Sequence, residues 1–270
     1  MIRPLRHFAL LVICSCTTLG PMPATTGISA VPVDRPGLEL QVGFTPGFYL
    51  SQSAQGSARG APIAQIAALL ELDRVIRLPG LLFGARVFGP EGDGMLEPYL
   101  GYRHRLGDRL AVLGGVYGTT KRAEKNLASY HGTRIGGEGA IDATLWEPAA
   151  WFALHGQAAL SLTRVFASGT YCVDAQGVAK ECETDPMKNT MVSGEQTGFY
   201  PSAVGTVALD FGRDVNRRFG GVRLALMAGG GAMPLVRDGV KIDTGAYVIV
   251  GATLTLTLGL ADKESDSLPE

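Results

Sequence analysis

Apolar and polar residues alternate along several stretches of the chain. From Leu254 to Leu260, leucine occupies every second position and threonine or glycine lies between. Residues 38–45 and 150–163 repeat this pattern, with apolar side chains such as Leu40 on one face and polar ones such as Gln41 on the other. Period-two alternation is typical of β-strands that have one apolar face. The sequence therefore predicts an all-β protein.

Alternation with more exceptions continues through residues 81–89, 95–105, 109–118, 133–145, 197–211 and 219–232. Residues 62–77 are ambiguous, because Ile63, Ile66 and Leu70 would also share one face of a helix. Counting this segment as a strand gives ten strands, and eight is the alternative.

The predicted connections are of two kinds that alternate along the chain. Short turns are expected near residues 79–80, 107–108, 147–148 and 214–217, and longer polar connections at 51–62, 90–94, 120–132, 168–196 and 233–243. Short turns at one end and long loops at the other are typical of membrane barrels. We therefore predict an antiparallel, up-and-down transmembrane β-barrel spanning residues 38–260.

Alternation alone also fits a soluble barrel or sandwich, in which the apolar face would point inward. The charged residues favour the membrane form, because all six lysines fall in predicted loops or the tail, whereas arginines occupy strand positions. Arginine suits an ion-paired interior, since its planar group holds carboxylates with two hydrogen bonds. The predicted network of charges in the lumen consists of Glu39, Glu97, Arg103, Arg105, Arg109, Arg134, Glu138, Asp142, Asp210 and Arg223.

Aromatic residues gather near the ends of the predicted strands, for example Trp146, Trp151 and Phe199. Such positions predict the two aromatic girdles that flank the apolar belt of a membrane barrel. Arg164 falls on the apolar face but near a strand end, from which a long side chain reaches lipid headgroups.

The closing strand Tyr247–Leu258, a glycine followed by alternating hydrophobic residues, resembles the assembly signal of small bacterial outer-membrane β-barrels. The resemblance covers residues 37–260 and identifies no subfamily. It implies about 8–12 strands, an outer-membrane location and membrane lipid as a partner. The chain departs from many members by continuing past this strand as a polar tail, residues 261–270.

The N-terminus is typical of an export signal, with Arg3 and Arg6 before a short apolar run, residues 8–14. Residues 1–30 are the predicted signal peptide, cleaved after Ala30 and followed by a linker at 31–37. The alternative is lipoprotein processing before Cys16, which would then be acylated. In an exported chain the remaining pair, Cys172 and Cys182, predicts a disulfide.

Composition and motifs narrow the function classes. A net charge of −1 disfavours nucleic acid as a partner. The sequence holds no phosphate-binding glycine motif and no serine nucleophile elbow, and no metal or cofactor is predicted. The favoured function is non-enzymatic, namely a structural or surface-interaction role with an extracellular ligand bound through loop 168–196, or a narrow pore.

Two alternatives remain open. One is an outer-membrane barrel that hydrolyses peptides or lipid A, with rim candidates Asp93, His131, Asp238 and Asp243. The other is a soluble or lipid-anchored barrel that carries an apolar ligand.

Overall fold

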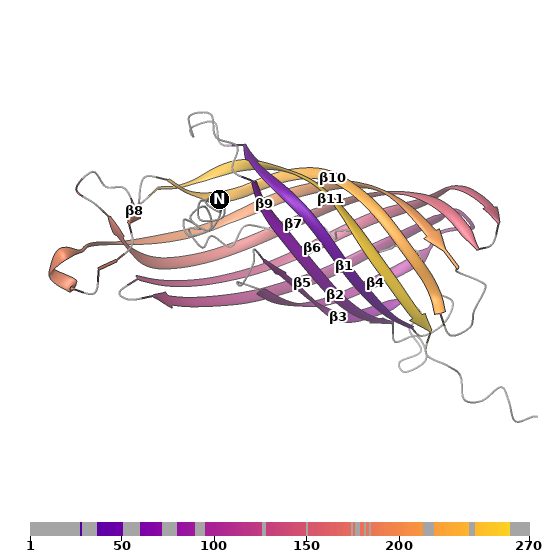
Figure 1. The fold of residues 1–270 in the computed structure, drawn as a ribbon, viewed down its shortest axis with the longest axis horizontal. Coiled ribbons are helices and arrows are strands. Elements are labelled where there is room, and N and C mark those ends of the chain that lie inside the picture. Colours follow the sequence, from indigo (N-terminus) through magenta and orange to yellow (C-terminus); the bar gives the residue numbers. More distant parts are fainter. Residues whose placement is uncertain are drawn as a thin grey trace, which may run out of the picture.

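The structure is a computed structural model of the 270-residue chain. It describes Ile28 and residues 37–50, 60–71, 80–89, 95–125, 128–149, 151–173, 175, 179–180, 182–183, 185–212, 219–237 and 241–259. Nearly all of these residues lie in β-strands (Figure 1).

Ten long strands form the wall of the molecule. They are β1 (Gly37–Leu50), β2 (Gly60–Glu71), β3 (Leu81–Gly89), β4 (Met95–Arg105), β5 (Leu110–Lys125), β6 (Ala128–Ala149), β7 (Phe152–Val173), β9 (Thr190–Phe211), β10 (Phe219–Arg237) and β11 (Lys241–Gly259). The two-residue strand β8 (Ala179–Lys180) and the 3-10 turn Pro186–Lys188 lie between β7 and β9. No helix in the described residues is long and apolar enough to cross a membrane.

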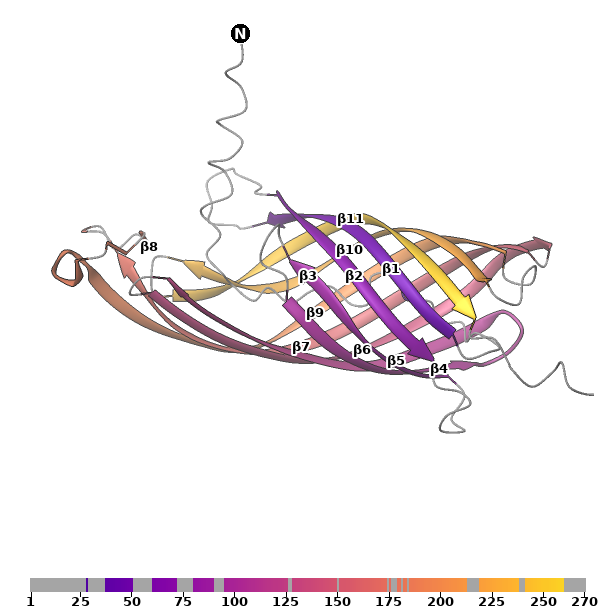
Figure 2. The same cartoon turned by 60° about the horizontal axis from the view of Figure 1, so that its bottom comes forward.

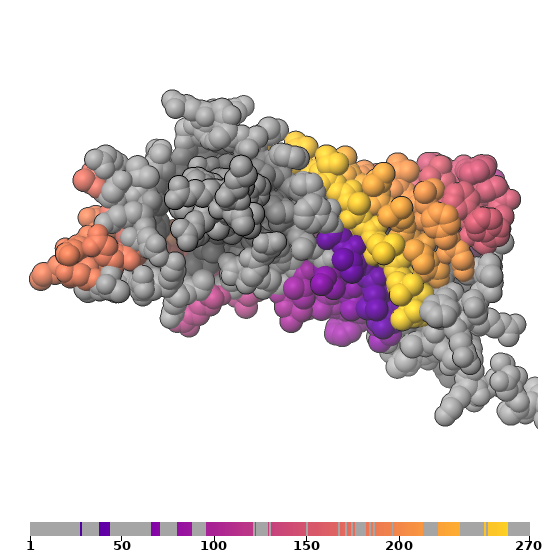
Figure 3. Space-filling view, in the orientation of Figure 1, coloured from indigo at the N-terminus to yellow at the C-terminus, as the bar shows by residue number. Residues whose placement is uncertain are grey.

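The ten strands close into an antiparallel barrel. Each pairs with the next along the chain, β7 pairs with β9, and the first and last strands pair from Gly37–Gly259 to Leu50–Ala246. Figure 3 shows β1 and β11 side by side on the surface. The predicted count of ten is confirmed, and residues 62–71 of the ambiguous segment belong to strand β2.

Tight turns mark one end of the barrel, which we call the short-turn end. Gly80 and Gly212 have positive φ angles of 86° and 78°, a backbone conformation that favours glycine. The N–H of Arg103 donates to the Gly80 oxygen at 2.9 Å, and that of Gly212 to the Trp151 oxygen at 2.7 Å. We call the opposite end, with the long connections, the loop end.

Side chains on the wall are arranged opposite to those of a soluble protein. Large apolar residues point outward, with Leu160 67% and Leu226 64% exposed, whereas Glu97 and Arg134 inside the barrel are 0% exposed. A continuous apolar exterior of this kind is stable against lipid and not against water. The barrel is therefore of the transmembrane kind, as predicted.

The wall is much taller on one side than on the other (Figure 2). Strands β1–β4 have 9–14 residues, whereas β6, β7 and β9 have 22 each. A transmembrane strand needs only about 9–11 residues. The predicted loops 120–132, 168–196 and 233–243 are thus wrong in their bounds, because much of each continues its neighbouring strands beyond the apolar belt.

Candidate functional site

The lumen on the β3–β6 side holds a buried ion-pair cluster. The Glu97 carboxylate bridges two arginines, with 2.5 Å from Oε1 to Arg86 and 2.5 Å from Oε2 to Arg134. Arg86 also contacts Glu138 at 3.4 Å. Arg86 and Glu97 are direct register partners on β3 and β4, and Arg134 reaches Glu97 from β6, across β5. The cluster therefore ties together β3, β4 and β6 from the inside.

Two tyrosines pack against the same arginine. The Arg86 guanidinium carbon lies 5.0 Å from the centre of the Tyr99 ring and 4.7 Å from that of Tyr117. The Tyr117 hydroxyl and the Thr163 hydroxyl of β7 are 2.7 Å apart. These aromatic rings fill lumen volume beside the ion pairs, so side chains rather than an open channel occupy this level of the barrel.

A second cluster lies near the short-turn end. His155 stands between two carboxylates, with Nδ1 2.9 Å from Asp142 and Nε2 3.2 Å from Asp210. Arg223 contacts the same two carboxylates at 2.9 Å and 3.4 Å. The four residues come from β6, β7, β9 and β10, so this cluster joins the wall on the side opposite β1–β3. On the remaining arc, Arg103 of β4 pairs with Glu39 of β1 at 2.7 Å.

Eight of the ten residues expected in the network lie in the lumen, divided among these three separate groups of ion pairs. The structure differs from the prediction at Arg105 and Arg109, which are exposed at the turn between β4 and β5. Arg105 and Arg109 fit the two-residue period of the lumen-facing positions. They lie at the turn, however, where the barrel wall ends. Sequence reasoning missed Arg86 and His155, although each follows the inward period of its strand, Arg86 after Leu82 and Gly84.

Ile28 occupies the lumen as well. It is 1% exposed and belongs to a buried apolar cluster with lumen-facing residues such as Leu69, Leu82 and Leu113. The Gln157 side-chain amide donates to the Ile28 main-chain oxygen at 2.7 Å. Cleavage after Ala30 would remove this residue from the barrel, whereas processing before Cys16 would retain it.

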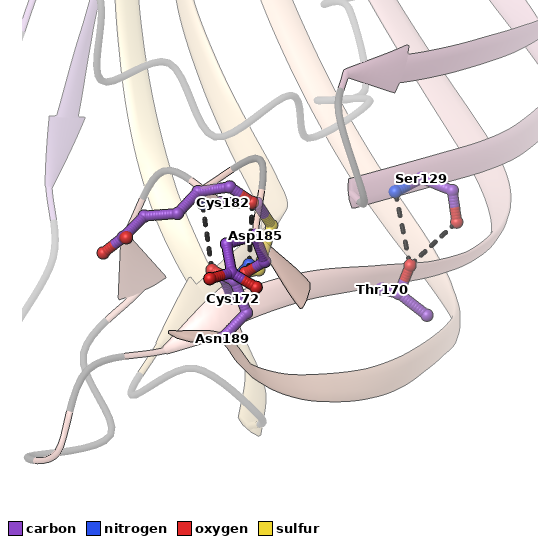
Figure 4. The surroundings of a disulfide bond; sticks show 7 residues. Ser129, Thr170, Cys172, Cys182, Asp185 and Asn189 are labelled. Carbon is purple, nitrogen blue, oxygen red and sulfur yellow. Dashed lines mark hydrogen bonds between the residues drawn. A yellow bond between two sulfur atoms is a disulfide. The ribbon is translucent and has the colours of Figure 1, made fainter. Parts of the chain in front are cut away.

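At the loop end, β7 and β9 continue as a hairpin past the last β9–β10 pair, with β6 alongside β7 as far as Thr170, and a disulfide closes it. Cys172 and Cys182 are bonded, with Cα atoms 5.2 Å apart, which confirms the predicted pair (Figure 4). The Asn189 side chain donates to the Glu183 and Asp185 oxygens at 2.7 and 2.9 Å. The tip is thus held by covalent and polar contacts and leaves Met187 97% exposed.

Aromatic residues mark both edges of the apolar belt. Phe152 contacts Trp146, Trp151 and Phe211, with ring centres 5.1–5.8 Å apart, near the short-turn end. Twelve residues further along β7, Arg164 lies over the rings of Phe166 and Phe199 at 4.5 and 5.1 Å. Twelve residues rise about 40 Å along a strand, or roughly 30 Å along the membrane normal at a tilt of about 40°. That height matches a bilayer core of about 30 Å.

Other predicted positions lie outside the described residues. They are Cys16, the rest of the signal region apart from Ile28, linker residues 31–36, the tail, and the rim candidates Asp93 and Asp238. His131 is exposed on β6 and forms no ion pair with a carboxylate among the described residues. In the same part of the chain, no group of three His, Cys, Asp or Glu side chains could hold a metal ion.

The closed antiparallel wall, the apolar exterior and the charged interior occur together in one class of fold. The chain has the fold of a bacterial outer-membrane β-barrel. No protein-family model matches it, and no curated protein does.

Several solved structures align with most of the chain. Ail, the attachment invasion locus protein of Yersinia pestis, is 10% identical, with 82% of this chain and 99% of that chain covered and a TM-score of 0.30. Neisserial surface protein A is 11% identical, with 86% and 99% covered and a TM-score of 0.33. The outer membrane protease OmpT from Escherichia coli is 9% identical, with 88% and 100% covered and a TM-score of 0.41. Likeness at this level brings no ligand or activity to this chain.

Proposed function

We propose that the protein is a non-enzymatic barrel of the bacterial outer membrane that presents the β7–β9 hairpin to the outside for surface interaction. The observation that carries the proposal is the hairpin itself. It extends past the apolar belt, and the Cys172–Cys182 bond and the Asn189 contacts fix its tip. A rigid, exposed element loses little conformational freedom when it binds, which favours affinity.

The filled lumen favours a barrel that anchors the hairpin over a barrel that conducts ions. Glu97, Arg86 and Arg134 are nearly inaccessible to solvent, and Tyr99 and Tyr117 fill the space beside them. We therefore expect the barrel to anchor the hairpin and to conduct little. In planar bilayers the native protein should give no steps above those of buffer, and a steady open channel would contradict this part of the proposal.

Export precedes this role. We propose that the signal peptide at residues 1–30 directs the chain across the inner membrane, with cleavage after Ala30 or before Cys16. The mass of the mature protein separates the two. A chain that begins at Val31 lacks Ile28, and a chain that begins at an acylated Cys16 retains it in the lumen.

The function is tested by removing the hairpin. A variant in which Asn-Gly replaces residues 168–196, so that Ala167-Asn-Gly connects the paired residues Phe166 and Thr197, keeps the part of β7 and β9 within the belt. Intact bacteria displaying the native protein or this variant are compared for adhesion to surfaces coated with fibronectin, laminin or heparin. We expect adhesion of the native strain to at least one surface and its loss in the variant, while unboiled protein still migrates as a folded barrel. Equal adhesion of the two strains to all three surfaces would contradict the proposal.

A further inference from the structure

The outer half of β9 has a partner on one side only. β9 pairs with β7 along its whole length, from Thr190 to Phe211. Its pairing with β10 covers only Ser202 to Phe211. β10 continues to Arg237, but there it pairs with β11 alone. Among the described residues, the β10-facing side of residues 190–199 is therefore a free strand edge, which we call the β9 edge.

Two prolines explain why the ladder stops. The last β9–β10 pair is Ser202 with Gly231. Continuing the register by one residue would set Pro201 opposite Ala232, and continuing it by three would set Pro234 opposite Phe199. Proline has no N–H to donate, so each removes a ladder hydrogen bond. The sequence itself thus ends the pairing near the outer aromatic girdle.

The β9 edge lacks the usual devices that protect a strand edge. Residues 190–199 contain no lysine and no proline, and Glu195 is their one charged residue. Ten residues give an edge about 33 Å long, in which every second residue turns both its N–H and its C=O to the open side. Such an edge is a template for another extended chain.

We propose that the β9 edge binds an extended segment of an extracellular polypeptide by strand addition, with a lysine or arginine of that segment opposite Glu195. Met191 and Phe199 are 47% and 60% exposed on the same face of β9 as Glu195, so the fitting segment carries apolar residues toward its ends. The inference rests on the proposed function, because it names the class of partner that the hairpin takes.

Membrane geometry argues against a second copy of this chain as the occupant. A two-fold axis parallel to the strands would set N–H groups opposite N–H groups, so a symmetric contact between identical edges is antiparallel. An antiparallel β9–β9 contact would turn the second barrel upside down. Two barrels inserted in one membrane share one orientation, so they do not satisfy this pairing.

The test uses the full-length protein in detergent micelles and two fluorescein-labelled nonapeptides. One is Val-Thr-Val-Thr-Lys-Thr-Val-Thr-Val, in which the terminal valines share the face of the lysine, and the other has glutamate at the central position. Binding is followed by fluorescence anisotropy, and hydrogen exchange reports protection of residues 190–199. We expect the lysine peptide to bind about fivefold more tightly than the glutamate peptide, as a cross-strand charge pair allows, and to protect those amides.

Charge reversal supplies the decisive comparison. Glu195→Lys should invert the preference, so that the glutamate peptide binds more tightly. Glu183→Lys, which makes the same change at the hairpin tip away from the edge, should leave the preference unchanged. The proposal is overturned if the native protein binds neither peptide, if Glu195→Lys does not invert the preference, or if Glu183→Lys inverts it equally.

The two proposals fail in different ways. Adhesion that requires residues 168–196 but is the same in Glu195→Lys and unaffected by excess lysine peptide would overturn strand addition and leave the hairpin function in place. Adhesion that survives removal of residues 168–196 would overturn the hairpin function itself.

Discussion

Strand β7 crosses two regions that share one backbone ladder and differ in nearly everything else. Between Phe152 and Phe166 its side chains alternate, with Leu160 67% exposed on the outside and Thr163 and Val165 0% exposed on the inside. Beyond this belt, from Ser168 to Thr170, residues on both faces are at least partly exposed and polar or small. Pairing with β9 continues through both regions without a break. Backbone hydrogen bonds thus hold the strand along its whole length. The alternation of apolar and polar side chains occurs only where one face meets lipid and the other meets the packed lumen.

The two regions are also stabilised by different contacts. The belt region depends on closure of the barrel and on buried pairs such as Glu97 with Arg86 and Arg134. The outer region depends on the disulfide, on Asn189 and on hydroxyl pairs such as Ser129 with Thr170 at 2.9 Å. Changes in one region should therefore leave the other intact.

The largest effect is expected for Glu97→Ala. This change leaves the guanidinium groups of Arg86 and Arg134 buried with their shared carboxylate removed, which should lower the free energy of unfolding by about 3–5 kcal/mol. Urea titration in detergent micelles, followed by the fluorescence of Trp146 and Trp151, measures it. The neighbouring Leu96→Ala removes a lipid-facing side chain and serves as the control. Equal losses in the two variants would contradict a special role for the lumen pairs.

A smaller and local effect is expected when the disulfide is removed. Cys172→Ser with Cys182→Ser opens a loop of about ten residues, and loop-closure entropy of that size corresponds to about 2–3 kcal/mol for the hairpin tip. Protease should cut the tip faster, while the heat-dependent gel shift of the barrel stays unchanged. Loss of that shift would show that the two regions fold as one unit.

The third-largest effect is expected at one of two neighbouring glycines on β5. A methyl group at Gly115 would collide with the Tyr99 ring, whereas one at Gly114 would meet nothing within 4 Å. Gly115→Ala should therefore lower the free energy of unfolding by about 1–3 kcal/mol, the usual range for overpacking, and Gly114→Ala should not. The same urea titration compares them, and two equal values would show that Tyr99 moves without cost.

The smallest effect is expected at the boundary between the two regions. Arg164→Ala removes the cation that lies over Phe166 and Phe199, which should lower the free energy of unfolding by about 0.5–1 kcal/mol. Arg164→Lys keeps a cation there and should recover part of the loss. Titration in lipid vesicles is the measurement, and a stabilised Arg164→Ala variant would contradict the assignment of this position to the headgroup level.

Most of the fold could be predicted from the sequence, because the belt imposes its two environments on every second residue. The limits of the outer strands could not, since both faces of those segments meet water and alternation has no cause there. The two-residue period assigns each residue of the network to a face of its strand and does not say where the strand ends. Whether Arg109 pairs in the lumen or meets solvent depends on where the wall stops, and a period of two carries no such information. His155 lies on the predicted polar face but was left out of the network, because its partners, Asp142 and Asp210, come from other strands.

Pairing between β1 and β11 has a consequence for the order of events in assembly. The contact Gly37–Gly259 joins residues at opposite ends of the barrel sequence, so the ring cannot close until its last strand has arrived. Until then both terminal strands carry unsatisfied backbone groups, and the chain must be kept apart from its copies. Closure is therefore the slow, late step of folding, as expected where contacts are distant in sequence. A chain that ends before Tyr247 would reach the membrane with most of the partner for its first strand missing.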